Sequence, residues 1–198
     1  AYAALTLVAV LAFLPLFPSW WEGPVIALTA VSTGGFTPRP DSLAGYSRAA
    51  QAAVLLVCLA SAFSLMFYVR LRRDGLRGAF FGTNAAAMVA FAVSVAVAAG
   101  FLRLGTGGDI PAVFDSLLNM LSAVTTAGFS VAPVVEAPPL LALMLGAMIV
   151  GGGAGSTAGG LKLERALTFA RAVRLALLRL RVPPEAVTPL MAEGERVP

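Results

Sequence analysis

Two short segments of the chain share an ordered pattern of hydroxyl residues, glycine and phenylalanine. The first has the sequence VSTGGFT at residues 31–37, and the second has VTTAGFS at residues 124–130. Small hydroxyl and glycine residues allow the backbone to turn so that its carbonyl oxygens point inward and replace the water around a cation. The pattern therefore predicts that main-chain oxygens coordinate a dehydrated cation, and that each segment supplies one quarter of a selectivity filter.

The residues expected to form this filter occupy equivalent positions in the two segments. An alternative is a pair of ordinary glycine-containing turns between buried helices, with threonine hydroxyls bonded locally at a helix end. One copy alone would favour the turn, but two copies in the same register favour the filter. Phe36 and Phe129 also coincide and are expected to pack behind the filter. The predicted main-chain ligands, with the glycines that set their geometry, are Ser32, Thr33, Gly34, Gly35, Thr125, Thr126, Ala127 and Gly128.

Each segment follows an apolar run that is too short to cross a bilayer. The runs cover residues 25–31 and 113–124, whereas a spanning helix needs roughly 20 apolar residues. A half-helix that returns as extended chain leaves backbone groups unpaired, and these are tolerated only where they line a water-filled cavity. We therefore expect two re-entrant pore loops. Asp109, just before Pro111, is expected to cap the second half-helix.

A third segment, residues 151–160, contains six glycines and interrupts an apolar span that begins at Leu140. Each glycine costs about 1 kcal/mol in a helix relative to alanine, so we expect a flexible intramembrane loop that gates the pore below the filter. A phosphate-binding loop does not fit, because Lys162 does not directly follow the second glycine of such a motif. Close helix packing explains some of the glycines but not six. The predicted gate residues are Gly151, Gly152, Gly153, Gly155, Ser156, Thr157, Gly159, Gly160 and Lys162.

Lys162 would be costly in lipid and should face water or a partner. Together with Arg165, it either bears on gating or anchors the chain at the cytoplasmic surface by snorkelling.

The composition indicates an integral membrane protein. The chain is 59% hydrophobic and 12% charged, with a mean hydropathy of +0.87, whereas soluble domains are about 45–50% apolar and about 25% charged. There is no histidine, which excludes histidine-based catalytic triads and metal sites. No nucleophile–base cluster is visible, so we do not expect an enzyme. The net charge of +4 comes from basic residues that flank apolar spans and predicts no nucleic-acid partner.

The remaining segments are expected to be full spans and loops. Full spans are predicted over residues 48–69 and 80–102, with the tail of another helix at residues 1–16. Basic residues cluster at 70–77 and 162–181, so this side should be cytoplasmic and the filter segments should open outward. Acidic residues that could concentrate cations near the outer mouth are Glu22, Asp41, Asp109, Asp115 and Glu136.

These segments resemble the Trk/Ktr/HKT superfamily of potassium transporters, in particular the bacterial TrkH/TrkG branch. Residues 32–38 resemble its second pore loop, residues 125–129 its third, and residues 152–162 the intramembrane loop of its third repeat. The resemblance covers nearly the whole chain. It implies an all-α integral membrane fold of potassium-channel-like helix–pore-helix–helix repeats, with re-entrant pore loops and one broken transmembrane helix.

The resemblance also implies a function and an organisation. Residues 1–78 would be a second pore repeat, 79–182 a third repeat with its intramembrane loop at 151–161, and 183–198 a cytoplasmic tail. The family takes up K⁺ through one pore formed by four repeats, down its gradient or by symport, without an organic cofactor. It implies a multi-pass protein of the bacterial inner membrane, in contact with membrane lipid, that forms a homodimer and is regulated by a cytosolic nucleotide-binding ring of the TrkA type.

Two other functions remain open at this stage. A secondary transporter could bind a small solute between broken helices, although the apolar spans offer few polar groups beyond Asn84 and Asn119. The chain could also be a membrane subunit that does not transport. Only two of the four pore loops are present, and two filter segments cannot enclose an ion alone.

Overall fold

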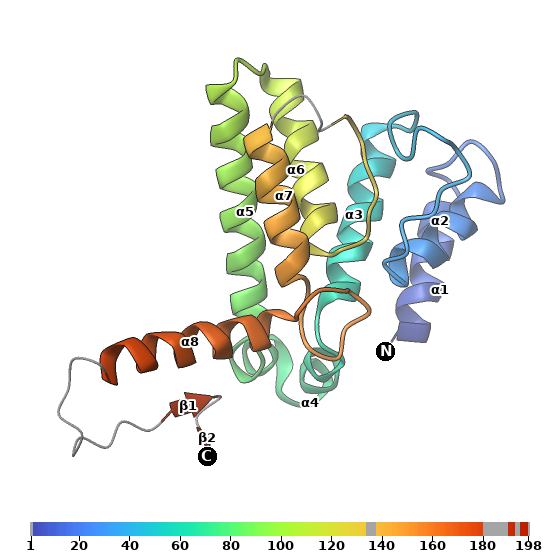
Figure 1. Cartoon of the computed structure of the whole chain (residues 1–198). Helices are drawn as coiled ribbons and strands as arrows, with labels where there is room; N and C mark the ends of the chain where they lie inside the picture. The colour runs from blue at the N-terminus through green and yellow to red at the C-terminus, as the bar shows by residue number, and fades with distance from the viewer. Residues whose placement is uncertain (1, 134–137, 180–189, 193–194, 198) are drawn as a thin grey trace.

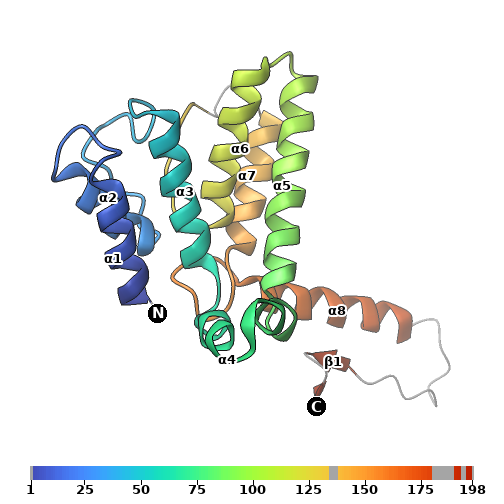
Figure 2. The same ribbon diagram turned by 180° about the vertical axis from the view of Figure 1, so that it is seen from behind.

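The computed structural model describes residues 2–133, 138–179, 190–192 and 195–197, which are almost entirely helical (Figures 1 and 2). The described helices are α1 (Tyr2–Phe13), α2 (Glu22–Val31), α3 (Arg48–Ala62), α4 (Leu65–Gly82), α5 (Ala85–Gly105), α6 (Ile110–Val124), α7 (Pro138–Val150) and α8 (Leu163–Arg179). A short antiparallel pair, β1 (Leu190–Ala192) and β2 (Glu195–Val197), follows them. The all-α fold class predicted from the sequence is confirmed, with this hairpin as a small addition.

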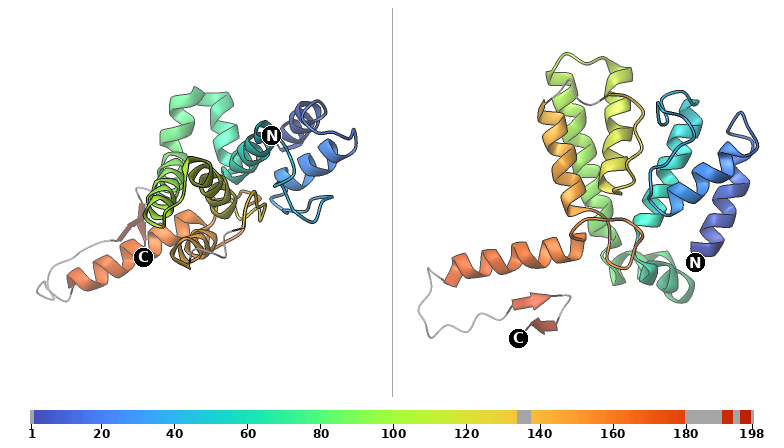
Figure 3. Two further views of the ribbon diagram at one scale, coloured as in Figure 1. Left: turned by 90° about the horizontal axis from the view of Figure 1, so that it is seen from above. Right: turned by 45° about the vertical axis from the view of Figure 1, so that its right-hand side comes forward.

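The helices form two similar groups that stand side by side (Figure 3). In one, the short helix α2 packs between α1 and α3; in the other, α6 packs against α5 and α7. The groups meet where α3 contacts α6. Each group therefore has the order helix, short helix, extended loop, helix, which places both filter-like segments at the inner ends of α2 and α6.

The span predicted over residues 48–69 is wrong. The chain bends by 84° between α3 and α4, because Phe63 is extended and the Ser64 hydroxyl accepts a hydrogen bond from the Met66 amide, which starts a new helix. α4 carries four arginines and runs across the foot of the bundle (Figure 1). The helix that follows α3 is therefore basic and departs from the direction of α3.

Within the described residues, α5 is the one continuous helix that is long and apolar enough to cross a membrane, and α3 with α4 counts as a bent pair. The span predicted from residue 80 begins later, at Ala85, since Thr83 is extended and ends α4. α4 is itself interrupted at Gly75, whose φ is 71°. The domain boundary proposed after residue 78 lies inside this helix.

The basic segments lie at one end of the molecule. α4 and the start of α8 meet below α5, while the loop that contains Arg39 and the last turn of α5, which contains Arg103, lie at the opposite end (Figure 1). α8 projects sideways from the bundle, away from the foot of α5 (Figures 1 and 3). Leu163 and Leu167 at its start pack into the core of the α5–α7 group. The two ends of the bundle are thus chemically distinct.

Candidate functional site

The segment that follows α2 forms a tight C-terminal turn. The Gly34 amide donates to the Thr29 carbonyl at 2.8 Å, and the Thr33 amide donates to the Ala30 carbonyl at 3.1 Å. This pair of bonds satisfies the last carbonyls of the helix and is the pattern of a Schellman motif, in which the residue after the cap has a positive φ. The turn ends α2 abruptly and lets the chain leave the helix as extended backbone.

The segment that follows α6 has the same turn, displaced by 93 residues. The Ala127 amide donates to the Ser122 carbonyl at 3.0 Å, and the Thr126 amide donates to the Ala123 carbonyl at 3.0 Å. Each donor and each acceptor therefore occupies the same position in the sequence repeat as its counterpart in the first turn. The two sequence repeats adopt the same local structure.

The two turns also share an unusual backbone conformation. φ is 51° at Thr33 and 54° at Thr126, and it is 70° at Gly35 and 82° at Gly128. Glycine adopts positive φ freely, but a β-branched residue there is a genuine outlier, and the left-handed conformation costs about 1–2 kcal/mol. Strained residues that occur at equivalent positions in two loops mark a candidate functional site.

The turns touch one another near the centre of the molecule. A Cβ atom on Gly35 would lie 2.2 Å from the carbonyl oxygen of Ala127 and 3.2 Å from the carbonyl carbon of Gly128. The predicted filter residues of the two segments are therefore brought together, main chain against main chain. Among the described residues, no group of three or more His, Cys, Asp or Glu side chains could hold a metal ion.

The glycine-rich segment 151–162 is not helical and closes on itself. The Leu161 amide donates to the Ile149 carbonyl and the Leu163 amide to the Gly152 carbonyl, each at 2.9 Å. A Cβ on Gly151 would lie 2.2 Å from the Gly159 carbonyl oxygen, so the neck of the loop admits no side chain there. The predicted helix break is confirmed, and the loop that replaces the helix has a hydrogen-bonded neck.

Two charged side chains bind the loop, one as a hydrogen-bond donor and the other as an acceptor. The Lys162 ammonium donates to the carbonyls of Ser156, at 3.4 Å, and Ala158. The Glu164 carboxylate accepts from the Ala154 amide at 2.6 Å. Lys162 was expected to face water or a partner, but its charge is satisfied by the carbonyls of its own loop. The sequence analysis missed Glu164. Its place in the first turn of α8, two residues after Lys162, could have indicated that it also binds the loop.

The loop lies against the inner side of both turns. The Thr33 hydroxyl donates to the Thr157 carbonyl at 3.0 Å, and the Gly159 amide donates to the Thr126 hydroxyl. The loop is also tied to the end of α3, where the Gly153 amide donates to the Ala62 carbonyl at 3.0 Å. The predicted filter and the predicted gate are therefore in direct contact.

Two buried amide side chains position the chain on the outer side of the turns. Asn119 of α6 accepts from the Val131 amide and donates to the Ala132 carbonyl, each at 2.9 Å. Gln51 of α3 donates to the carbonyls of Leu43 and of Tyr46. Each amide is 2% exposed, so the segments that follow the two turns are held by specific buried bonds. Gln51 was missed, although an amide inside an apolar helix is a usable signal.

The outer acidic residues are largely engaged with the protein. Glu22 pairs with Arg39 at 3.5 Å, and Asp115 pairs with Arg48. Asp109 caps α6 as predicted, accepting from the Ala112 amide at 3.0 Å. These partners reduce the negative charge that the outer acids were expected to offer to cations.

Arg39 and Tyr46, in the loop beyond the first turn, interact electrostatically with each other and with Glu22. Arg39 lies over the Tyr46 ring, 4.3 Å from its centroid. Burial, followed by the neighbouring Glu22 carboxylate, raises the pKa of Tyr46 to about 12. Glu136, the fifth predicted acid, lies outside the described residues.

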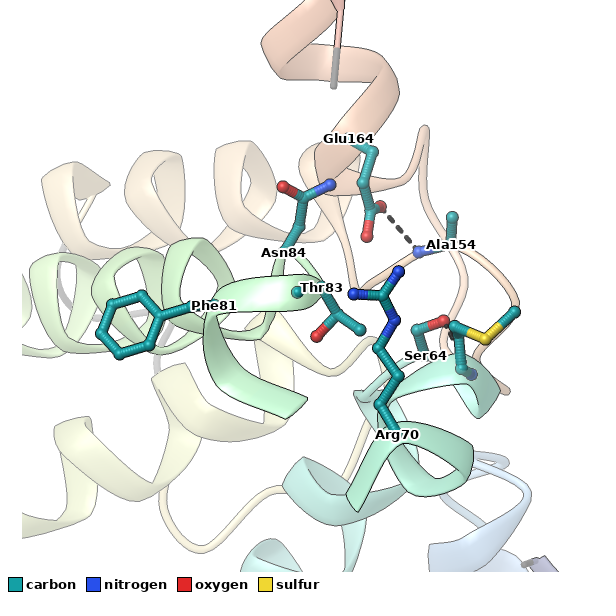
Figure 4. Close-up of a pocket in the computed structure, with 9 residues that line it drawn as sticks. Ser64, Arg70, Phe81, Thr83, Asn84, Ala154 and Glu164 are labelled. Atoms are coloured by element: carbon teal, nitrogen blue, oxygen red, sulfur yellow. Dashed lines mark hydrogen bonds between the residues drawn. The ribbon is translucent and has the colours of Figure 1, made fainter. Parts of the chain in front are cut away.

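A cavity of about 540 Å³ opens at the basic end, beside the glycine loop. Its lining comes from Ser64, Arg70, Thr83 and Glu164, among others. Figure 4 shows the Arg70 side chain reaching into this space toward the carboxylate of Glu164, which is bonded to the loop. The cavity gives the loop an open, polar side that faces away from the turns.

Comparisons with known proteins agree with this arrangement. Residues 111–197 match a family model described as TrkH, cation transport protein. The chain is 30% identical over 195 residues to the Trk system potassium uptake protein TrkH of Halomonas elongata, which covers 94% of this chain and 39% of that protein. It is 27% identical over 173 residues to an uncharacterized cation transporter of Methanocaldococcus jannaschii, covering 85% of this chain and 34% of that one.

A solved structure shows the same fold. The crystal structure of the potassium transporter TrkH from Vibrio parahaemolyticus superimposes with a TM-score of 0.91 at 24% identity, over 99% of this chain and 43% of that chain. This chain therefore spans less than half the length of each of these proteins.

Proposed function

The Trk-type relationship predicted from the sequence is confirmed, and from it we propose that this chain forms part of a potassium uptake pathway. In this proposal, K⁺ loses its water and is held by the main-chain carbonyls of residues 32–34 and 125–127. Gly35 and Gly128 set the backbone geometry that aims these carbonyls. The glycine-rich loop 151–161 gates the pathway on its inner side.

The main support for the proposal is that the two turns have the same structure. They share sequence, hydrogen bonds and positive φ values, and they touch through backbone atoms at Gly35 and Ala127. A cation filter requires several equivalent strands that present carbonyls to one axis. Strained backbone and closely packed main chains are what such a site needs, whereas ordinary turns between helices need neither.

The flanks of the two turns support a larger ring. Phe129 of the second turn is 1% exposed and packs into the core of the α1–α3 group, but Phe36 of the first turn is 75% exposed. Likewise, a Cβ on Gly35 would strike the second turn, while nothing described lies within 4 Å of the same position on Gly128. We infer that further loops of this kind complete the pore on both open sides.

The surroundings of the pathway extend the proposal. The arginine-rich end formed by α4 and α8 faces the cytoplasm, and the chain crosses the bacterial inner membrane several times in contact with lipid. The full-length protein acts as a homodimer, and a nucleotide-binding ring of the TrkA type regulates it from the basic end. The chain is a transporter segment and not an enzyme.

A substitution at Gly35 tests the filter assignment. In the full-length protein, Gly35→Ser introduces a Cβ into the 2.2 Å contact with Ala127 and should alter the K⁺/Na⁺ preference. Uptake is measured in a potassium-starved bacterial strain and as K⁺ and Na⁺ flux in vesicles that contain the purified protein.

Gly107→Ser is the matched control. Gly107 also has a positive φ, of 80°, but no described atom lies within 4 Å of its Cβ position. Backbone strain is therefore comparable, while the contact between the turns is untouched. The filter assignment is wrong if the Gly35 variant transports K⁺ and Na⁺ as the Gly107 variant does.

A further inference from the structure

The two threonines with positive φ each hold the same loop. The Thr33 hydroxyl shares its proton between the Thr157 carbonyl, at 3.0 Å, and the carbonyl of Ser32 in its own turn, at 2.7 Å. The Thr126 hydroxyl accepts from the Gly159 amide. One contact therefore uses a carbonyl of the loop and the other uses an amide two residues further on. Two side chains that are equivalent by the internal repeat therefore bind one segment, two residues apart, one as a donor and the other as an acceptor.

The residue type at these positions is informative. Glycine and asparagine are the usual residues where a helix ends in a left-handed turn, because a β-branched residue is strained there. Glycine would relieve the strain in both turns but would supply no hydroxyl. The feature that threonine adds at both positions, and that the structure uses at both, is a side-chain oxygen directed at the loop.

The loop is shaped to receive these hydroxyls. A Cβ on Gly159 would lie 3.1 Å from the Thr126 hydroxyl oxygen, so a side chain at this position would crowd the contact. Thr157 is held on its other side, since its own hydroxyl donates to the Ser61 carbonyl of α3 at 3.2 Å. The loop is thus fixed between the end of α3 and the two turns.

We propose that the hydroxyls of Thr33 and Thr126 are a latch that holds the 151–161 loop closed beneath the filter. The proposal rests on the proposed function, because it assigns regulation to the same site. Both residues are also proposed cation ligands through their carbonyls. A rotation of either peptide as the filter gains or loses an ion therefore moves the hydroxyl that holds the loop, which links filter occupancy to the gate. In this role they are positioning residues.

Hydrogen–deuterium exchange of the full-length protein tests the latch without relying on transport. Thr33→Val and Thr126→Val keep the shape and the backbone strain but remove each hydroxyl. A single hydrogen bond of ordinary net strength corresponds to about a fivefold change in an opening equilibrium. Amides in residues 151–161 should exchange about fivefold faster in each variant and about 25-fold faster in the double variant. Thr33→Ser and Thr126→Ser retain the hydroxyl and should exchange as the unmodified protein does.

Thr106→Val is the matched control, because the Thr106 hydroxyl donates to the Arg103 carbonyl at 3.0 Å, at the end of α5 opposite the loop. Gly159→Ala approaches the same contact from the loop side and should also accelerate exchange. It serves as the test if a valine variant does not fold. Unchanged exchange in the valine variants and in Gly159→Ala, or equal acceleration in the serine variants, would overturn the latch.

Ion flux separates the latch from the proposed function. Resting K⁺ flux in vesicles should rise in the valine variants by the same factors as exchange. A lost preference with unchanged loop exchange would mean that the hydroxyls serve the filter alone, which contradicts the latch. Faster loop exchange in a protein that moves no K⁺ in any form would support the latch and refute potassium transport.

Discussion

The first and second turns have one backbone but two environments. In the second, Thr125, Ala127 and Phe129 are almost completely buried, whereas the equivalent Ser32, Gly34 and Phe36 are largely exposed. The hydrogen bonds and φ values nevertheless agree between the turns. The conformation is therefore set locally, by a helix end followed by the Thr-x-Gly pattern, and not by burial.

The surrounding residues determine where each turn lies relative to the other. The second turn is fixed by the α1–α3 group on one side and touches the first turn on the other, while the first turn lacks a comparable cover over Phe36. A turn with a fixed shape becomes part of a filter only when its neighbours align it with the others. Each prediction below changes one turn and compares it with its counterpart.

The largest expected effect is at the glycine whose flank is open. Gly128→Ala adds a Cβ where nothing described lies within 4 Å, so in this segment alone its cost is the left-handed strain, about 1–2 kcal/mol. In the full-length protein we expect another loop to occupy that space. Gly128→Ala should then reduce K⁺ uptake more than tenfold, and we expect the same of Gly35→Ala, whose Cβ would lie 2.2 Å from the Ala127 carbonyl oxygen.

Uptake by Gly107→Ala, which carries the same kind of strain away from the turns, should remain near the unmodified level. If Gly128→Ala behaves like Gly107→Ala in the full-length protein, no further loop packs against the second turn. That result would contradict the proposal that the two turns are equivalent members of one ring of filter segments.

The next effect concerns the buried amides that hold the outer segments. Asn119→Leu leaves the Val131 amide and the Ala132 carbonyl without their side-chain partner, and an unsatisfied buried group costs about 1–3 kcal/mol. Gln51→Leu orphans only carbonyls, beside the first turn. We expect the Asn119 variant to lower the thermal unfolding midpoint of the detergent-solubilised protein more than the Gln51 variant. Equal midpoints would show that the outer segment of the second turn is no more dependent on its clamp than that of the first.

Much of this arrangement was predictable from the sequence, because it is encoded over short distances. The two short helices, the turns after them, the helix break at the glycine run and the Asp109 cap each depend on residues within a few positions of one another. The short helices begin three residues before the apolar runs at Val25 and Val113, because a proline in the first turn, Pro24 or Pro111, is compatible with a helix start.

The rest could not be predicted because it depends on pairs that are far apart in the chain. The bend after α3 is stabilised by the loop, where the Leu65 amide donates to the Gly155 carbonyl at 3.3 Å. The threonine–loop contacts join residues separated by 124 and 33 positions. Likewise, the compact closure of the loop by Lys162 follows from the path of the chain, and no local pattern signals it.

The smallest expected effect distinguishes the two outer ion pairs. Arg48→Gln breaks an exposed pair with Asp115, and exposed pairs contribute about 0–1 kcal/mol. Arg39→Gln also exposes the ring of Tyr46 and leaves Glu22, whose side chain is 9% exposed, without its counter-charge. Urea unfolding of the solubilised protein should therefore show a larger loss of stability for Arg39→Gln. A larger loss for Arg48→Gln would mean that the link from α3 to α6 matters more than the support of the first turn.

The most direct measurement is the location of the ion in the full-length protein. Crystals soaked with Tl⁺, a heavy substitute for K⁺, should show anomalous density on the axis between the two turns, within coordination distance of the carbonyl oxygens of Thr33 and Thr126. Density restricted to acidic side chains, or none near these carbonyls while Tl⁺ is bound elsewhere along the pathway, would contradict a filter built from the repeated turns.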